Sequence, residues 1–261
     1  MKNVVIYFSG TGNNLFVARK LAEGLGDSIV YPFKAFSEYR NELDNFDRII
    51  FCVPSYHSHI PNYVKKMIGM MNFTSKQKIY SVVSCGGNRG MSIEDLREEV
   101  SQAGGQVFGE YMIMLPGSYI LGYGGFPNFF VEIEILLSKI KIGKIVKEIK
   151  QDKRRMMKRP GMFYKVSDEP RLQQAIAEYA SIGAAYTVSD ECVGCGICES
   201  VCPVKNISMK DGKPAFGQEC QQCMACIQWC PKRAIDYEGK TSKRRRYHHP
   251  EVRVKDVERN R

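Results

Sequence analysis

Eight of the ten cysteines of this 261-residue chain lie in two runs that share one spacing. Each run reads C-x2-C-x2-C-x3-C and is followed directly by a proline, and the second run repeats the first 28 residues further along. The runs comprise Cys192, Cys195, Cys198 and Cys202, then Cys220, Cys223, Cys226 and Cys230. Two copies of one short motif predict a small, pseudo-symmetric domain organised around its thiols.

Thiolates at this spacing are typical ligands of iron-sulfur cubes. Three cysteines two residues apart can surround one 4Fe-4S cluster, while the fourth lies too far along the chain and serves the other cluster. We therefore expect two clusters with crossed ligands. The first takes Cys192, Cys195, Cys198 and Cys230, and the second takes Cys202, Cys220, Cys223 and Cys226.

Two other uses of cysteine compete with this interpretation. Disulfides need an oxidising compartment, and the N-terminal residues lack the pattern of a secretory signal. Zinc is the stronger rival because C-x2-C also makes tetrahedral sites, although zinc sites rarely add a third cysteine at the same step or repeat the C-P ending. Over about residues 186–238 the sequence resembles the bacterial two-cluster ferredoxins.

The N-terminal residues predict a strand, a phosphate-binding loop and a helix. Residues 3–8 form an apolar, β-branched run typical of a buried parallel strand. Apolar residues then recur at helical spacing from Leu15 to Leu25, and Gly26 ends the pattern. The loop between them therefore lies at a helix N-terminus, where free backbone N–H groups and the helix dipole favour a phosphate.

Three kinds of phosphate loop could occupy this position. A Walker A loop needs Lys and Ser or Thr after its last glycine, but Asn13 and Asn14 stand there. A dinucleotide loop needs a third glycine, where this chain has Leu15. The loop instead resembles the FMN-binding loop of flavodoxins through Ser9, Thr11, Gly12, Asn13 and Asn14, with Asn14 departing from the more usual Thr or Ser.

Further strands and helices alternate as expected for an α/β domain. We predict strands over 29–33, 48–53, 78–84 and 106–115, and helices over 36–43, 61–71 and 92–103. Pro32 fits an edge strand better than a central one. The predicted fold is a flavodoxin-like, doubly wound parallel sheet in the order 2-1-3-4-5, followed by a small α+β two-cluster ferredoxin domain.

Ligands of such sheets bind outside the carboxyl ends of the strands. The third strand leads into Pro54, Ser55, Tyr56 and His57, so Tyr56 is a candidate to stack on the flavin ring, and His57 or His59 to bond its edge. The fourth strand leads into Cys85, Gly86, Gly87 and Asn88, where the glycines allow close approach of the backbone. Surface packing of Tyr56, solvated histidines and a plain tight turn are the structural alternatives, and Cys52 is expected in the core.

The segment after the fifth strand, residues 116–127, is rich in glycine and aromatic residues and is expected to be a lid over the flavin, a platform for the ferredoxin domain, or a long surface loop. A long helix is predicted over 129–155, with Ile133, Leu136, Leu137, Ile140, Ile145 and Ile149 on its core side and its basic second half directed towards the other domain. A further helix is predicted over 171–186.

The net charge of +10 is concentrated in two segments, residues 139–160 and 241–261. Such runs form either solvated faces and frayed tails or docking surfaces for an acidic redox protein. No recognition motif for nucleic acid accompanies them, and no apolar run approaches the ~20 residues of a membrane span. We expect a cytoplasmic protein of an anaerobic cell that binds neither nucleic acid nor membrane; its oligomeric state is open.

The module order resembles the flavodoxin-ferredoxin fusion proteins of anaerobic bacteria and archaea, over nearly the whole chain. That resemblance implies a flavodoxin-like FMN domain over 1–158, a helical linker over 159–185, a two-cluster ferredoxin domain over 186–240 and a basic tail over 241–261. The expected function is electron transfer between FMN, two 4Fe-4S clusters and an external redox partner. The alternative is a ferredoxin-fed flavin reductase of a small substrate, with His57, His59 and Arg89 as candidate anchors; a third possibility is a basic scaffold or nucleic-acid-binding protein with structural clusters.

Overall fold

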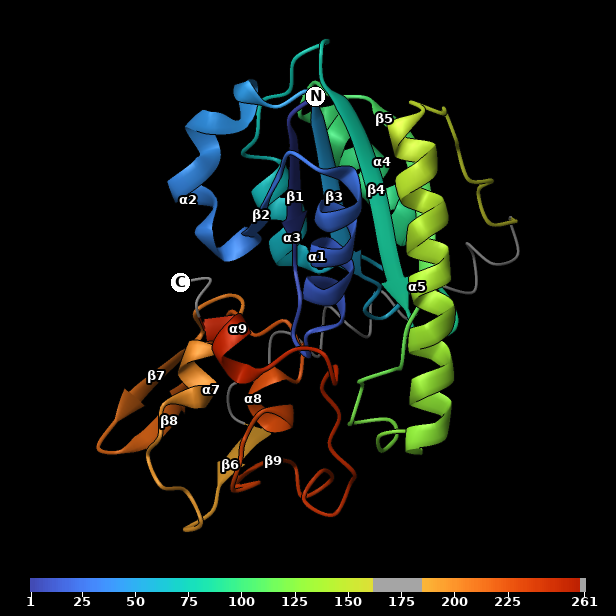
Figure 1. Ribbon diagram of the computed structural model, residues 1–261. Coiled ribbons are helices and arrows are strands. Elements are labelled where there is room, and N and C mark those ends of the chain that lie inside the picture. The colour runs from blue at the N-terminus through green and yellow to red at the C-terminus, as the bar shows by residue number, and fades with distance from the viewer. Residues whose placement is uncertain (162–184, 259–261) are drawn as a thin grey trace.

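The computed structural model describes residues 1–161 and 185–258. A larger lobe holds a five-stranded sheet covered by helices on both faces, and a smaller lobe is built from short strands and single-turn helices (Figure 1). The helix predicted over 171–186 and most of the linker predicted over 159–185 lie outside the described residues.

The large sheet is parallel throughout and has the strand order β2-β1-β3-β4-β5, which confirms the predicted order. Its strands are β1 (Asn3–Tyr7), β2 (Ser28–Pro32), β3 (Arg48–Pro54), β4 (Lys78–Cys85) and β5 (Val107–Met114). The edge strand β2 ends at Pro32, where the missing backbone N–H removes no bond from the centre of the sheet. The central strand β1 is buried along its whole length.

Helices cover the two faces of the sheet in separate layers (Figure 1). Val5 and Tyr7 of β1 point to the face under α1 (Asn13–Leu25) and α5 (Asn128–Lys150). Val4 and Ile6 point to the other face, because successive strand residues alternate. That face packs against α2 (Phe36–Tyr39), α3 (Asn62–Ile68) and α4 (Ser92–Gln102). The helices α2 and α3 are shorter than the helices predicted over 36–43 and 61–71. Two 3-10 turns, over Phe33–Ala35 and Arg40–Asn45, flank α2.

The side of α5 that faces the core differs from the prediction. Four residues assigned to the core side are exposed instead, with exposed fractions of 39% to 59%: Ile133, Leu136, Leu137 and Ile140. The buried side carries Val131, Ile135, Ser138, Ile142, Ile145 and Ile149. Both stripes have helical spacing, so periodicity alone cannot choose between them. Packing against α1 selects the side that is buried. The two helices approach closely at Gly24, where an added Cβ would lie 2.8 Å from Cγ2 of Val146.

The direction of α5 also corrects an expectation. The helix ends at Lys150, and its N-terminal half, not its basic second half, lies beside the smaller lobe (Figure 1). Asn128 and Lys139 make this contact, through a hydrogen bond from Arg245 and an ion pair with Glu251 at 2.7 Å. The six apolar side chains Phe129, Phe130, Ile133, Leu136, Leu137 and Ile140 form an exposed outer stripe on this half.

The smaller lobe repeats one unit. A helical turn follows the second cysteine of each motif, as α7 (Ile197–Ser200) and α8 (Ala225–Gln228), and each turn is preceded by a residue with positive φ, Gly196 or Met224. Two antiparallel strand pairs complete the lobe: β6 (Tyr186–Val188) with β9 (Ile235–Tyr237), and β7 (Ile207–Lys210) with β8 (Lys213–Phe216). The predicted pseudo-symmetry is present in the backbone.

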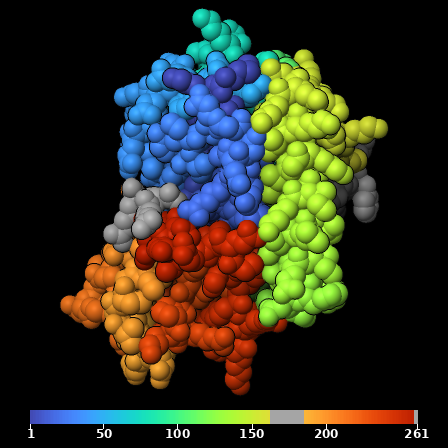
Figure 2. Space-filling view, viewed as in Figure 1, coloured from blue at the N-terminus to red at the C-terminus, as the bar shows by residue number. Residues whose placement is uncertain are grey.

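The described part of the predicted basic tail is packed, not frayed. Residues 241–258 wrap between the two lobes and end in α9 (Val254–Glu258), and Figure 2 shows them as the red surface directly beneath the blue residues of α1. Tyr247, Val252 and Val257 are buried in the same apolar core as α1. The free energy gained by burying these side chains outweighs the tendency of the neighbouring basic residues to stay in solvent. The charge pattern of the sequence alone had indicated only the second of these effects.

Within the two described ranges, no helix is both long enough and apolar enough to cross a bilayer.

Candidate functional site

A cavity of about 620 Å³ opens at the carboxyl edge of the large sheet. Its walls are the loops that follow β1, β3, β4 and β5, together with residues 222–224 of the smaller lobe. A volume of this size is typical of pockets for small molecules and cofactors. Twelve of the thirteen residues proposed from sequence for the flavin line it: Ser9, Thr11, Asn13, Asn14, Pro54, Ser55, Tyr56, His57, Cys85, Gly86, Gly87 and Asn88.

The loop after β1 offers backbone donors to this cavity. Gly12 has φ of +90° and directly precedes α1, and its N–H donates to Oγ of Ser9 at 3.1 Å. The first intrahelical bond runs from Phe16 N–H to the Gly12 carbonyl at 2.9 Å, so the amides at the start of α1 have no partner inside the helix. Gly12 is the proposed residue that does not line the cavity; its α-carbon faces Val252 instead.

The side chains of Asn13 and Asn14 brace the loop. Nδ2 of Asn13 donates to the Pro116 carbonyl at 3.0 Å, and its Oδ1 accepts from the Tyr247 hydroxyl at 2.7 Å. Nδ2 of Asn14 donates back to the Phe8 carbonyl at 3.0 Å. These residues therefore line the cavity, and their amide groups also hold neighbouring segments of the chain in place.

The loop after β3 packs tightly on the one after β4. Tyr56 and His59 exchange backbone hydrogen bonds at 2.8 and 2.9 Å, and a Cβ on Gly90 would overlap Ser58. Tyr56 packs edge-on against Phe8, with ring centroids 6.3 Å apart. His57 reaches the smaller lobe, where its Nε2 lies 2.9 Å from Oε1 of Gln222.

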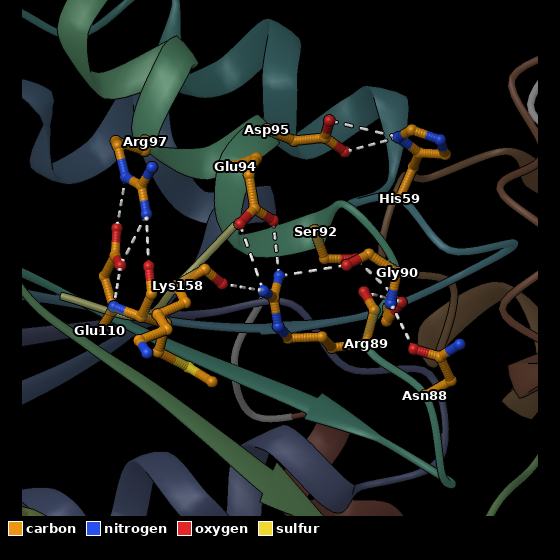
Figure 3. Close-up of polar contacts among 12 residues, drawn as sticks. His59, Asn88, Arg89, Gly90, Ser92, Glu94, Asp95, Arg97, Glu110 and Lys158 are labelled. Atoms are coloured by element: carbon orange, nitrogen blue, oxygen red, sulfur yellow. Dashed lines mark hydrogen bonds and ion pairs between the residues drawn. The ribbon is translucent and has the colours of Figure 1, made fainter. Parts of the chain in front are cut away.

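A polar network supports the loop that follows β4 and contains Gly86 and Gly87 (Figure 3). The Arg89 guanidinium pairs with Glu94 and donates to the Lys158 carbonyl, so its charge is held inside the fold. His59 lies outside the cavity lining and contacts Asp95 at 2.9 Å. Of the three candidate substrate anchors, therefore, His57 alone lines the cavity.

One further ion pair completes this support. Arg97 forms a two-pronged pair with the fully buried Glu110, at 2.6 and 2.8 Å, and Glu110 also accepts from the Met157 N–H at 2.7 Å. Donation of hydrogen bonds to the Glu110 carboxylate raises the pKa of Arg97. Together these contacts anchor residues 157–158 to the back of the site.

Residues 116–127 bridge the lobes. Positions 116–119 and Tyr123 line the cavity, and a Cβ on Gly86 would lie 3.0 Å from Cα of Gly117. On the other side, Nε2 of Gln228 donates to the Ser118 carbonyl at 3.0 Å. The loop thus covers the cavity and also contacts the smaller lobe, so the two functional roles weighed from sequence are compatible.

The eight motif cysteines line two separate cavities in the smaller lobe. One cavity is lined by Cys192, Cys195, Cys198 and Cys230, and the other by Cys202, Cys220, Cys223 and Cys226. Among residues 1–161 and 185–258, no three His, Cys, Asp or Glu side chains are arranged to hold a single metal ion.

Local contacts favour charged sulfur in both cavities. Backbone N–H groups donate to sulfur at Cys202 from Asn206 (3.2 Å) and at Cys230 from Ala234 (3.3 Å). The two acceptor cysteines are equivalent positions of the repeat, 28 residues apart, and such hydrogen bonds stabilise thiolates. Burial acts in the opposite direction and, together with neighbouring sulfurs, raises the pKa of the Cys223 and Cys226 thiols, which therefore keep their protons until a positively charged group displaces them.

The remaining two cysteines differ in position. Cys52 is fully buried in the sheet, as expected for a core residue, and Cys85 lines the large cavity. Burial raises the pKa of both thiols. Gln222, Cys223 and Met224 were not proposed from sequence as lining of this cavity; they stand inside a cysteine motif, and nothing in that motif indicates which neighbour it contacts.

Comparisons with known proteins match each lobe separately. Residues 184–246 match a protein family described as 4Fe-4S dicluster domain. Among curated proteins, none matches the chain. The larger lobe is similar to a reduced Megasphaera elsdenii flavodoxin, at 18% identity and a TM-score of 0.37, over 42% of this chain and 84% of that one. It is also similar to a Streptococcus pneumoniae flavodoxin, at 16% identity and a TM-score of 0.36, over 43% and 83%.

A short-chain flavodoxin associated with a bacterial microcompartment is similar over 58% of this chain and 99% of its own, at 15% identity and a TM-score of 0.41. At these values the strand order itself, not the likeness, identifies the fold. The chain therefore joins a domain of flavodoxin-like topology to a C-terminal domain of the 4Fe-4S dicluster type.

Proposed function

We propose that this protein is an electron carrier that binds FMN in the large cavity and two 4Fe-4S clusters in the cysteine cavities. One observation supports this most: the large cavity is lined by both lobes, through residues 9–14 of one and residues 222–224 of the other. A cofactor in that cavity would touch the domain that matches the 4Fe-4S dicluster family.

The residues present suit FMN. The amides at the start of α1 and the hydroxyls of Ser9 and Thr11 can receive its phosphate, since a helix N-terminus favours an anion. Tyr56 and Tyr119 also line the cavity and can stack on the flavin ring, and Gly86 and Gly87 have no side chain that would keep their backbone from the ring.

The cysteine cavities suit the crossed ligand sets. Cys192, Cys195, Cys198 and Cys230 would hold one cluster, and Cys202, Cys220, Cys223 and Cys226 the other. When bound, FMN exchanges one or two electrons and each cluster exchanges one. Joining the sites in one chain makes transfer between them intramolecular, which raises the effective concentration of each site at the other.

The contacts of Arg89 and His59 favour a carrier over a small-molecule reductase. A reductase needs a charged anchor or acid beside the ring. Arg89 is paired with Glu94 and His59 contacts Asp95 outside the lining, while His57, which lines the cavity, is bonded to Gln222 of the smaller lobe. We further propose a cytoplasmic location and a protein redox partner, because thiolate-bound clusters suit a reducing compartment.

Anaerobic purification followed by flavin, iron and sulfide assays tests this function. We expect about one FMN and about eight iron atoms per chain. A reduction titration monitored by absorbance should then show flavin and clusters both accepting electrons. A protein that carries zinc in place of iron, or no flavin after purification and FMN addition, would refute the proposal.

A further inference from the structure

The two cysteine cavities differ in their relation to the large cavity. Cys223 and Met224 line both the large cavity and the cavity of Cys202, Cys220, Cys223 and Cys226, which we call the inner site. The cavity of Cys192, Cys195, Cys198 and Cys230, which we call the outer site, shares no lining residue with the large cavity in the described parts of the chain. Pseudo-symmetry makes the two sites alike in sequence, but the packing of the lobes makes them unequal.

The inner site touches the proposed phosphate loop directly. A Cβ added to Gly10 would overlap the Cys223 carbonyl oxygen and lie 2.9 Å from its Cβ. At the other end of α8, Nε1 of Trp229 donates to the Gly10 carbonyl at 2.9 Å, and Trp229 is only 7% exposed. Glycine is therefore needed at position 10 for the inner site to approach the loop, and the contact between the lobes is fixed on both sides of it.

The outer site opens to solvent. Val193 is 61% exposed although it is apolar, and Cys195 beside it is exposed as well. The loop is held in this position by Gly194, whose φ is +67° and whose α-carbon faces the carbonyl of Gly212 in the turn between β7 and β8. An exposed apolar side chain between two ligand cysteines is suited to contact another protein.

Resting on the proposed function, we propose that electrons enter or leave at the outer site and that the inner site alone connects it to FMN. The partner is an acidic one-electron carrier protein that docks over Val193 and Pro231. Lys232 and Arg233 are exposed at this rim and match an acidic partner in charge. In the reducing direction each docking event oxidises the partner by one electron. Two such events, with two protons from solvent, balance the two-electron reduction of FMN.

Redox potentials test the assignment of inner and outer sites. Cys195→Ser removes an outer ligand and Cys220→Ser an inner one, so each variant should keep one intact cluster and about half of the iron. The negative charge of FMN should lower the potential of a nearby cluster more than that of a distant one. In Cys195→Ser, FMN binding should therefore lower the potential of the remaining cluster, and in Cys220→Ser the potential should stay unchanged within error.

A larger shift in Cys220→Ser, or equal shifts in the two variants, would overturn the assignment. These outcomes differ from failure of the proposed function, in which the purified wild-type chain carries no FMN or no iron. If either cysteine variant fails to fold, the proposal is tested by the docking experiment below, which keeps all eight cysteines.

Docking is tested with Val193→Glu, which leaves all eight cysteines in place. The probe is a reduced acidic two-cluster ferredoxin, and dithionite serves as a reductant that needs no docking surface. We expect Val193→Glu to slow reduction by the ferredoxin at least about fivefold, because it adds repulsion and removes an apolar contact. Cofactor content and reduction by dithionite should match the wild type.

Met70→Glu is the matched control, since Met70 is 54% exposed on the larger lobe, between α3 and β4. It should leave the rate with ferredoxin unchanged. Equal rates for Val193→Glu and the wild type, slowing by Met70→Glu as large as by Val193→Glu, or a wild-type protein that the ferredoxin does not reduce, would each refute docking at the outer site.

Discussion

The hydroxyl of Tyr247 donates a hydrogen bond to Oδ1 of Asn13 at 2.7 Å, linking positions 234 residues apart. Close by, the His249 N–H donates to the Thr11 carbonyl at 2.8 Å, and Val252 packs against Gly12. The proposed phosphate loop is therefore held between the C-terminal segment on one side and Cys223 and Trp229 on the other. Its conformation depends on both lobes.

Tyr247→Phe should weaken the loop. The substitution removes one buried hydrogen bond and leaves Oδ1 of Asn13 without it, a loss of about 1–2 kcal/mol in the free energy of unfolding. Urea denaturation measures this loss, and flavin fluorescence measures the expected several-fold weaker FMN binding. Tyr31→Phe is the control, because it removes an exposed bond to Glu42 far from the loop. Equal behaviour of the two variants would contradict a role of Tyr247 in holding Asn13.

Gly10→Ala should separate the lobes at the inner site, since the added methyl overlaps the Cys223 backbone, which cannot move as a flexible side chain could. We expect a loss of at least about 2 kcal/mol in stability and reduced FMN retention. Gly143→Ala is the control, and its expected change in stability has the opposite sign. Nothing lies within 4 Å of its Cβ position in α5, so alanine should stabilise the helix by about 0.5–1 kcal/mol. Thermal unfolding compares the two, and a neutral Gly10→Ala would refute the close contact.

His249 makes stability depend on pH. Its ring is buried and stacks on Phe16 at 4.0 Å, and burial lowers its pKa from 6.5 to about 4, with smaller opposing contributions from Glu251 on one side and Lys139 and His248 on the other. Between these values the unfolded chain binds a proton that the folded chain does not, so stability must fall as pH drops from about 6.5 to about 4.

His249→Phe keeps a ring against Phe16 but removes the titration. The loss of stability between pH 7 and pH 5, measured by denaturation at each pH, should be smaller in this variant than in the wild type. A wild-type protein and variant that lose equal stability over this range would show that His249 does not stay neutral in the fold.

Arg97→Met should be strongly destabilising. It would leave the carboxylate of Glu110, which is fully buried, without its cationic partner, at a cost of about 3–5 kcal/mol. Replacing both residues, as Arg97→Met with Glu110→Leu, should recover most of that loss because no buried charge remains unpaired. Denaturant titration of the single and double variants measures the difference. A double variant as unstable as the single one would show that packing, not charge, dominates here.

Much of the fold could be predicted because it is encoded locally. The run of apolar residues before Ser9, the glycine at the end of α1 and Pro32 at the sheet edge each act through neighbours in sequence. The cysteine spacing likewise predicted two equivalent motifs, and the crossed sets line separate cavities. By contrast, α5 carries apolar residues on two sides, and contact with α1 through Gly24 and Val146 selected the side opposite to Leu136.

The sequence by itself predicted the position of the proposed phosphate loop and the division of the motif cysteines into two sets, because these depend on turn residues and spacing along the chain, while the strand order followed from the resemblance to flavodoxins. The tertiary structure alone decided which cysteine set lies beside the large cavity, since the two motifs are equivalent until one packs against Gly10. It also decided that the basic C-terminal segment is buried against α1. Contacts between residues more than 200 positions apart carry no signal in local pattern, and they unite the two lobes around one site.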